Sequence, residues 1–318
     1  MRWRPSNWSP SCELLCLVLA GVLFLASEPT RAKAAEAPTA AMATNPVVVP
    51  FQIRRGHIML PVRVTNSAPI SLMVDTGYAM TMLHPELIAN FGLRRTGRIT
   101  IVGIAGEAPA DVYEGPELDF SGVTWKPRRV AAFTDAGGGG RSRRRDGILG
   151  SGLFRRFVVE IDSQRREVRL HEPRSFHYTG QGEVLPLTFS GDTPVVEATL
   201  RLPDDTESKG RFEVDTGCDS ALCLGKHFVE AHRLSPTNSA GAGGNRFGVG
   251  GSTRTHVTHL PRIQLGQLSV LHPSANLFLE GSPVDPPYAG HIGWELLQRF
   301  RVIFDYPGKR LILEQPPE

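Results

Sequence analysis

Hydrophobic and polar side chains alternate along two well-separated segments, residues 57–64 and 195–202. This alternation is typical of strands with one buried face. Each segment is followed by a shorter apolar run and then by a single helical stretch, residues 84–92 in the first case and roughly 225–234 in the second. The other apolar runs are short, and the chain has 33 glycines and 25 prolines. The pattern therefore predicts an all-β protein with few, short helices.

The first 34 residues have a different pattern, which is typical of a processing segment. Two arginines precede an apolar run over residues 14–26, and Ala-Lys-Ala at 32–34 has the small side chains of a signal-peptidase site. The run is shorter than the about 20 residues that span a bilayer comfortably. We expect residues 1–34 to be a signal peptide of an exported protein, periplasmic or secreted, or a membrane anchor if they are not cleaved. Residues 35–46, rich in Ala and Pro, are expected to be a linker.

Composition and charge exclude several classes of protein. The chain has 318 residues, of which 21% are charged and 41% hydrophobic, and its formal net charge is +3. These values exclude a disordered or collagen-like chain, and they give no reason to expect an acidic partner. The glycine- and arginine-rich stretch over residues 137–145 is short and lacks interleaved aromatics, so it is interpreted as a solvated loop. No nucleic-acid partner is expected.

The chain also repeats itself. Four segments match four later segments in the same order, at offsets of 140, 145, 143 and 143 residues: 73–77 with 213–217, 102–106 with 247–251, 147–150 with 290–293, and 157–162 with 300–305. Two copies of one domain of about 125 residues explain this order. We therefore expect an N-terminal half over residues 47–180 and a C-terminal half over residues 181–318.

Both copies carry Asp-Thr-Gly after an apolar strand, as Asp75-Thr76-Gly77 and Asp215-Thr216-Gly217. A single such tripeptide is often only a turn. Two at the same place in a repeat are more informative, because a carboxylate at the end of a buried strand is costly unless it is paired or used. A pseudo-two-fold axis would bring Asp75 beside Asp215, and the pair would share one proton. One carboxylate can then take a proton from water while the other gives one to a substrate carbonyl.

The neighbouring residues suit this chemistry. Gly77 and Gly217 allow the backbone to approach closely, so that N–H groups can hydrogen-bond the carboxylates. Thr76 and Thr216 each offer a hydroxyl that can tie the two loops together across the axis. Water would be the nucleophile, so that neither a metal ion nor an organic cofactor is expected.

The order of the motifs resembles that of aspartic proteases of the retropepsin and pepsin type. Those proteins have hydrophobic-Asp-Thr-Gly, a Gly-rich flap and hydrophobic-hydrophobic-Gly, and here the set occurs twice. After the first tripeptide come Gly103-Ile104-Ala105-Gly106 and Ile148-Leu149-Gly150; after the second come Gly248-Val249-Gly250-Gly251 and His291-Ile292-Gly293. The resemblance covers residues 50–316, and the glycines in both flaps make retropepsins the more similar group.

This resemblance implies a bilobal acid-protease fold, with two β-barrel-like halves and the active site between them. It implies an aspartic endopeptidase with Asp75 and Asp215 as the catalytic dyad, and with flaps that close over an extended peptide or protein substrate. A retropepsin is similar to one copy and must dimerise. Two fused copies imply a monomer in which the halves pair within one chain.

Three residues depart from the family pattern. Tyr78 follows the first tripeptide where a small residue is usual, Cys218 follows the second, and His291 stands at a position that is usually apolar. Tyr78 leaves open a different class of protein, a non-catalytic peptide-binding module on the same fold. A processing protease restricted to one partner protein is a second alternative. A third is a protein in which each half pairs with a half of another chain.

The two cysteines after residue 34, Cys218 and Cys223, could be linked only if the chain reverses tightly between them. Buried free thiols are the other interpretation.

Competing sites are weak. His256 and His259, three residues apart on a strand, would face opposite sides and not share a metal ion. Asp162 and Asp305, which match each other in the repeat, are expected to cap turns.

Overall fold

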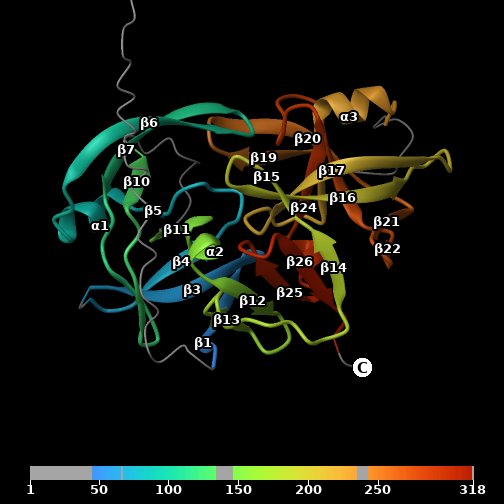
Figure 1. The fold of residues 1–318 in the computed structure, drawn as a ribbon. Helices are drawn as coiled ribbons and strands as arrows, with labels where there is room; N and C mark the ends of the chain where they lie inside the picture. Colours follow the sequence, from blue (N-terminus) through green and yellow to red (C-terminus); the bar gives the residue numbers. More distant parts are fainter. Residues whose placement is uncertain (1–44, 66, 134–145, 235–242, 317–318) are drawn as a thin grey trace, which may run out of the picture. The chain divides into compact units, whose positions relative to one another are not determined.

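A computed structural model describes residues 45–65, 67–133, 146–234 and 243–316, all of which belong to one compact unit. The expected signal peptide, most of the expected linker and the arginine-rich stretch over residues 137–145 lie outside the described residues. Within these ranges, no helix has the length and apolar character needed to cross a membrane. Figure 1 shows a molecule built mainly of strands, as the alternation predicted.

The first of three sheets contains ten strands from the N-terminal part of the chain. In sheet order they are β6 (Arg95–Gly103), β7 (Gly106–Glu114), β10 (Arg129–Phe133), β5 (Met82–Leu83), β11 (Gly147–Leu149), β4 (Ile70–Val74), β3 (His57–Val64), β8 (Leu118–Phe120) and β9 (Val123–Trp125), with β2 (Gln52–Arg54) beside β3.

The second sheet has ten strands in the same arrangement, one for each strand of the first. In the corresponding order they are β19 (Gly243–Gly248), β20 (Gly251–His259), β23 (Ser274–Phe278), β18 (Leu222–Leu224), β24 (Tyr288–Gly293), β17 (Glu207–Asp215), β16 (Thr193–Arg201), β21 (Arg262–Leu265) and β22 (Leu268–Leu271), with β15 (Thr188–Ser190) beside β16. The matching segments of the sequence therefore occupy matching places in the two sheets.

A third sheet of six strands is shared by the two parts of the chain. Its order is β1 (Val47–Pro50), β13 (Glu167–His171), β12 (Val158–Asp162), β25 (Arg301–Asp305), β26 (Arg310–Glu314) and β14 (Glu183–Pro186). At its centre β12 and β25 pair antiparallel, with Val159 opposite Phe304. All five residues of β12 are buried, which shows that both faces of the sheet are covered. The motif that closes each copy thus joins the two copies.

In the described part of the chain the helices are few and short, as expected. Two of them, α1 (Pro85–Asn90) and α3 (Lys226–Ala231), lie inside the two predicted helical stretches. The other two, α2 (Gly152–Arg156) and α4 (Trp294–Leu297), were not predicted, because helices of one turn show no periodicity in the sequence. The predicted turn caps are confirmed: Asp162 accepts from the Arg165 N–H at 2.9 Å and Asp305 from the Gly308 N–H at 2.8 Å.

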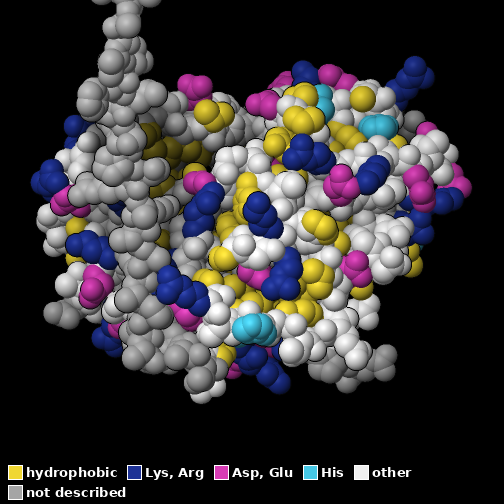
Figure 2. All heavy atoms as spheres, in the orientation of Figure 1, with side chains coloured by type: hydrophobic (Ala, Val, Ile, Leu, Met, Phe, Trp, Pro, Cys, Tyr) yellow, Lys and Arg dark blue, Asp and Glu magenta, His cyan; other side chains and the backbone are white. Residues whose placement is uncertain are grey.

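Charges are spread over the surface of the molecule. On the face drawn in Figure 2, Lys and Arg side chains alternate with Asp and Glu side chains over both parts of the chain. Several charged side chains of the molecule form ion pairs, such as Lys209 with Glu197 at 2.6 Å and Arg262 with Glu207 at 2.6 Å. These exposed pairs contribute little to stability individually.

Candidate active site

The two Asp-Thr-Gly turns begin at equivalent strand ends. Asp75 follows β4, whose neighbour β11 runs parallel to it, and Asp215 ends β17, whose neighbour β24 also runs parallel. The Asp75 N–H donates to the Leu149 carbonyl at 3.1 Å, which anchors the first turn to β11. Asp75 is 4% exposed, and the Asp215 side chain is 13% exposed. Two strands from different parts of the chain therefore place a buried carboxyl group, that of Asp75, beside a partly buried one, that of Asp215.

The two carboxyl groups meet, as the repeat predicted, and they are hydrogen-bonded to each other. Each also accepts an N–H from the glycine of its own turn, Asp75 from Gly77 at 2.9 Å and Asp215 from Gly217 at 2.8 Å. Each glycine lies against the carboxylate of the opposite turn. A Cβ on Gly217 would lie 2.1 Å from Asp75 Oδ2, and one on Gly77 would lie 2.8 Å from Asp215 Oδ1. Only glycine leaves room for this pair of carboxyl groups.

Two threonines tie the turns together. The Thr76 N–H donates to Thr216 Oγ1 at 3.0 Å, and the Thr216 N–H donates to Thr76 Oγ1 at 2.9 Å. The Thr76 hydroxyl donates to the Val214 carbonyl at 2.6 Å, and the Thr216 hydroxyl to the Val74 carbonyl at 3.1 Å. Both threonines are fully buried. The four hydrogen bonds cross between the turns and hold the two aspartates at one place.

This tie gives a prediction about stability. Thr76→Val keeps the side-chain shape but leaves the Thr216 N–H and the Val214 carbonyl without this partner, at a cost of about 2–3 kcal/mol in the free energy of unfolding. Thr76→Ser keeps the hydroxyl and should cost about 1 kcal/mol. Urea unfolding of the two variants measures both values. Equal losses would show that the hydroxyl contributes nothing.

The two aspartates differ in electrostatic environment. Burial, followed by the charge of Asp215, raises the pKa of Asp75 well above its usual range. Burial would raise the pKa of Asp215 as well, but the hydrogen bond and charge of His291 lower it overall. These environments favour the shared proton on Asp75 and the negative charge on Asp215.

His291 and Glu213 belong to this site, and the sequence interpretation missed their role. His291 Nδ1 lies 3.1 Å from Asp215 Oδ2, and His291 Nε2 lies 3.2 Å from Glu213 Oε2. The sequence marked His291 only as a departure from an apolar pattern. The available signal was that Glu213 and His291 stand where the first copy has two apolar residues, Met73 and Ile148.

The other departures are accommodated beside the site. The Tyr78 side chain packs with a small apolar cluster that includes Met82 and Ala131, so its size does not keep the two carboxyl groups apart. Cys218 and Cys223 are free thiols with their sulfur atoms 3.2 Å apart. The hydrogen bond with Cys223, together with burial, raises the pKa of the Cys218 thiol well above its usual range.

The predicted flaps are two hairpins, β6–β7 and β19–β20, whose tips touch. The Ala105 N–H donates to the Val249 carbonyl at 3.2 Å. Glycines make the contact close: a Cβ on Gly103 would lie 2.4 Å from the Val249 side chain, and one on Gly250 would lie 2.4 Å from the Gly106 nitrogen. Ala105 itself does not have a positive φ, so alanine replaces a flap glycine there without strain.

Gly250 is the residue at which the contact between the flap tips can be tested. Gly250→Ala would push a Cβ into Gly106 and would also strain the backbone, because Gly250 has a φ of +87°. If the touching tips close over a peptide, KM should rise about tenfold with a smaller change in kcat. Gly244→Ala is the matched control, since a Cβ there meets no atom within 4 Å. Identical kinetics for the two variants would contradict a role for the tip contact.

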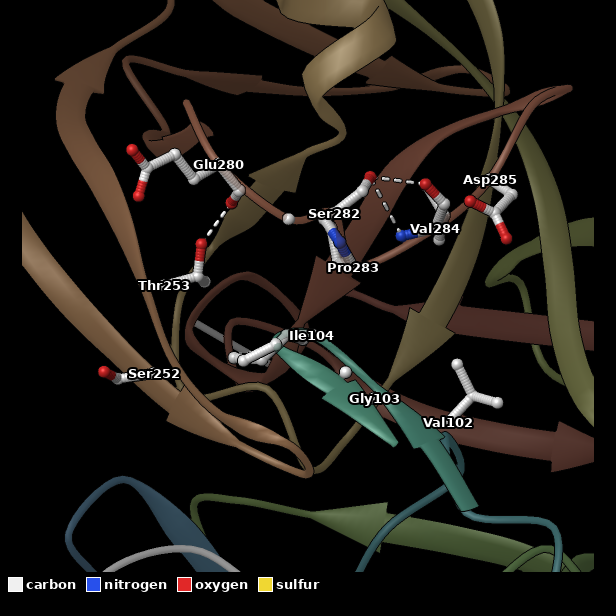
Figure 3. Close-up of a pocket in the computed structure, with 13 residues that line it drawn as sticks. Val102, Gly103, Ile104, Ser252, Thr253, Glu280, Ser282, Pro283, Val284 and Asp285 are labelled. Atoms are coloured by element: carbon white, nitrogen blue, oxygen red, sulfur yellow. Dashed lines mark hydrogen bonds between the residues drawn. The ribbon is translucent and has the colours of Figure 1, made fainter. Parts of the chain in front are cut away.

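A cavity of about 580 Å³ lies beside the first flap. The tip of this flap, Val102 to Gly106, forms one wall, and Glu280 to Asp285 form much of the other (Figure 3). Neither aspartate lines this cavity. In the described part of the chain, no three or more His, Cys, Asp or Glu side chains are grouped so as to hold a metal ion. His256 is buried on β20 and His259 is exposed.

Two equivalent sheets with an aspartate from each beside the other are the arrangement expected of an aspartic proteinase fold. A solved structure, an aspartic proteinase from Irpex lacteus, has this fold with a TM-score of 0.54 and 16% sequence identity, over 84% of this chain and 96% of that chain. The family model "Aspartyl protease" matches residues 60–153, which include Asp75 and the first flap. No curated protein matches the chain.

The family model matches the first copy and the structural match shows the fold, and both agree with the resemblance that the order of the motifs indicated. The match of the first copy to the family model supports a hydrolase of the protease type, and such a protease implies a peptide substrate. The family model ends before the second copy, which carries Glu213, Cys218 and His291.

Proposed function

We propose that this protein is an aspartic endopeptidase in which Asp75 and Asp215 together activate a water molecule. The observation that carries the proposal is the hydrogen-bonded pair of carboxyl groups, one with a raised and one with a lowered pKa. Two such groups whose environments separate their pKa values can act as acid and base in the same step. The flaps, the threonine tie and the facing glycines support the same function.

The proposed reaction divides the work between the two residues. Ionised Asp215 takes a proton from the water while the water oxygen attacks the peptide carbonyl carbon. At the same time, protonated Asp75 donates its proton to the carbonyl oxygen. The product is a neutral gem-diol. Asp215 then gives its proton to the amide nitrogen as the C–N bond breaks, and Asp75 recovers a proton from a gem-diol hydroxyl. Both residues end in their starting states, and one water is consumed.

The substrate is proposed to be an extended peptide segment held between the touching flaps and the dyad by main-chain hydrogen bonds and side-chain pockets. The sheet shared by the two parts of the chain supports a monomer that contains both halves of the site. Export, to the periplasm or out of the cell, remains our proposal from the first 34 residues.

The test is cleavage of an unfolded protein by the chain that begins at Ala35. Mass spectrometry would follow the products from about pH 3 to pH 7, a range that brackets a carboxyl pair that shares a proton. Asp75→Asn and Asp215→Asn proteins serve as controls. The proposal expects cleavage by the unchanged protein and by neither variant. Cleavage that survives either substitution would contradict the shared dyad.

A further inference from the structure

The two copies differ at one pair of positions beside the aspartates. In the first copy, β4 and β11 place Met73 opposite Ile148, and both side chains are apolar. In the second copy, β17 and β24 place Glu213 opposite His291 in the corresponding register. Both apolar residues of the pair are thus replaced by ionisable ones.

His291 has a carboxylate on each ring nitrogen. Its Nδ1 lies 3.1 Å from Asp215 Oδ2, and its Nε2 lies 3.2 Å from Glu213 Oε2. An ionised carboxylate only accepts hydrogen bonds, so the ring is an imidazolium when both of these carboxylates are ionised. The side chains are 11% exposed for His291 and 14% for Glu213, so water screens this ion pair little.

The other titratable groups near His291 come from the turn after β17, from β18 and from the first copy. Cys218 is hydrogen-bonded to His291, and Cys223 lies opposite it on β18. The charge of the His291 ring also acts on Asp75 across the site and lowers its pKa, although less than the other causes raise it. Burial would lower the pKa of His291, but the hydrogen bonds with Asp215, Cys218 and Glu213 raise it well above its usual range. The geometry and the charges therefore agree on a cation.

We propose that His291, oriented by Glu213, is a positioning residue that keeps Asp215 ionised and holds the shared proton of the dyad on Asp75. The inference rests on the proposed endopeptidase. In a symmetric dyad the proton can reside on either carboxyl group. Here a cation contacts one carboxylate, and an apolar residue, Ile148, stands at the corresponding place beside the other. The contact with His291 thereby makes Asp75 the acid and Asp215 the base before substrate binds.

Stability alone does not explain the pair. Replacement of a buried ion pair by well-packed apolar residues is often neutral or stabilising. The first copy shows that Met and Ile fit the corresponding place in this fold. The ion pair is therefore better explained by its contact with Asp215 than by packing.

The first copy supplies the variant for the test, Glu213→Met with His291→Ile. This protein lacks the cation, and each apolar side chain has a precedent at the corresponding position. We expect the acid limb of the pH profile of kcat/KM to move up by about one pH unit, because an adjacent opposite charge lowers a carboxyl pKa by one unit or more and the loss of Glu213 offsets part of the change. Thermal unfolding should show a melting temperature no lower than that of the unchanged protein. An unmoved acid limb in a folded variant would overturn the proposal.

A second measurement does not depend on cleavage. Nitrogen-15 NMR of histidine-labelled protein, with the His291 signal assigned through His291→Gln, reports whether both ring nitrogens carry hydrogen. We expect an imidazolium at pH 7, above the ordinary histidine pKa of about 6.5, and a neutral ring in Asp215→Asn and Glu213→Gln proteins. A neutral His291 at pH 6 in the unchanged protein would overturn the proposal. An imidazolium in a protein that cleaves nothing would support the placement of the proton and contradict only the endopeptidase.

Discussion

Asparagine in place of either aspartate is expected to lower peptide cleavage at least about a thousandfold. At position 215 the amide cannot take a proton from water. At position 75 the amide is a far weaker acid than the carboxyl group, so it cannot deliver a proton to the carbonyl oxygen as readily. In the proposed mechanism Asp75 and Asp215 act as one unit, so the double variant should be hardly worse than either single variant. The measurement is the initial rate of peptide cleavage at the pH optimum. A loss of less than about tenfold in one variant would contradict a shared dyad.

The same two substitutions should have opposite effects on stability. A loss of activity in both variants could therefore not be explained by unfolding. The folded-state pKa of Asp75 is raised, so its contribution to stability is present below the unfolded-state pKa and is lost as the pH rises. Asp75→Asn should therefore leave the melting temperature at pH 7 unchanged or higher. The pKa of Asp215 is lowered, so its contribution is present at pH 7, and Asp215→Asn leaves His291 without its partner. That variant should melt at a lower temperature.

Gly217→Ala is expected to lower kcat about a hundredfold while the protein remains folded. The added Cβ would lie 2.1 Å from Asp75 Oδ2 and 2.2 Å from its Cγ, so the carboxyl group must move by about 1 Å, and a displacement of that size can cost about a hundredfold. The φ of Gly217 is not positive, so the backbone itself is not strained. Stopped assays over a range of peptide concentrations would separate kcat from KM.

Two further glycine variants calibrate this result. Gly77→Ala places its Cβ 2.8 Å from Asp215 Oδ1, a milder overlap, and should cost less than Gly217→Ala. Gly97→Ala meets no atom within 4 Å and should have nearly normal activity. An active Gly217→Ala protein would show that the carboxyl groups need not be held as closely as the structure has them.

Local and repeated features of the chain could be predicted from sequence. The two tripeptides and the flap glycines each lie within a few adjacent residues, and the second copy gave each of them independent support. The unpredicted features depend on pairing between distant segments. The hydrophobic periodicity of β12 and β25 does not predict that Val159 lies opposite Phe304. Likewise, the contact of Glu213 with His291 depends on the parallel register of β17 and β24, 78 residues apart.

The join between β12 and β25 also bears on how such a site can evolve. In a dimer of identical subunits every substitution appears twice, so a histidine beside one aspartate would bring a second histidine beside the other. A single polypeptide that contains both copies escapes this constraint, because each copy mutates alone. The first copy has an apolar pair at Met73 and Ile148, and the second has an ionisable pair at Glu213 and His291. Two originally equivalent aspartates can therefore take different roles in a fused chain, whereas a dimer of identical subunits must keep them equivalent.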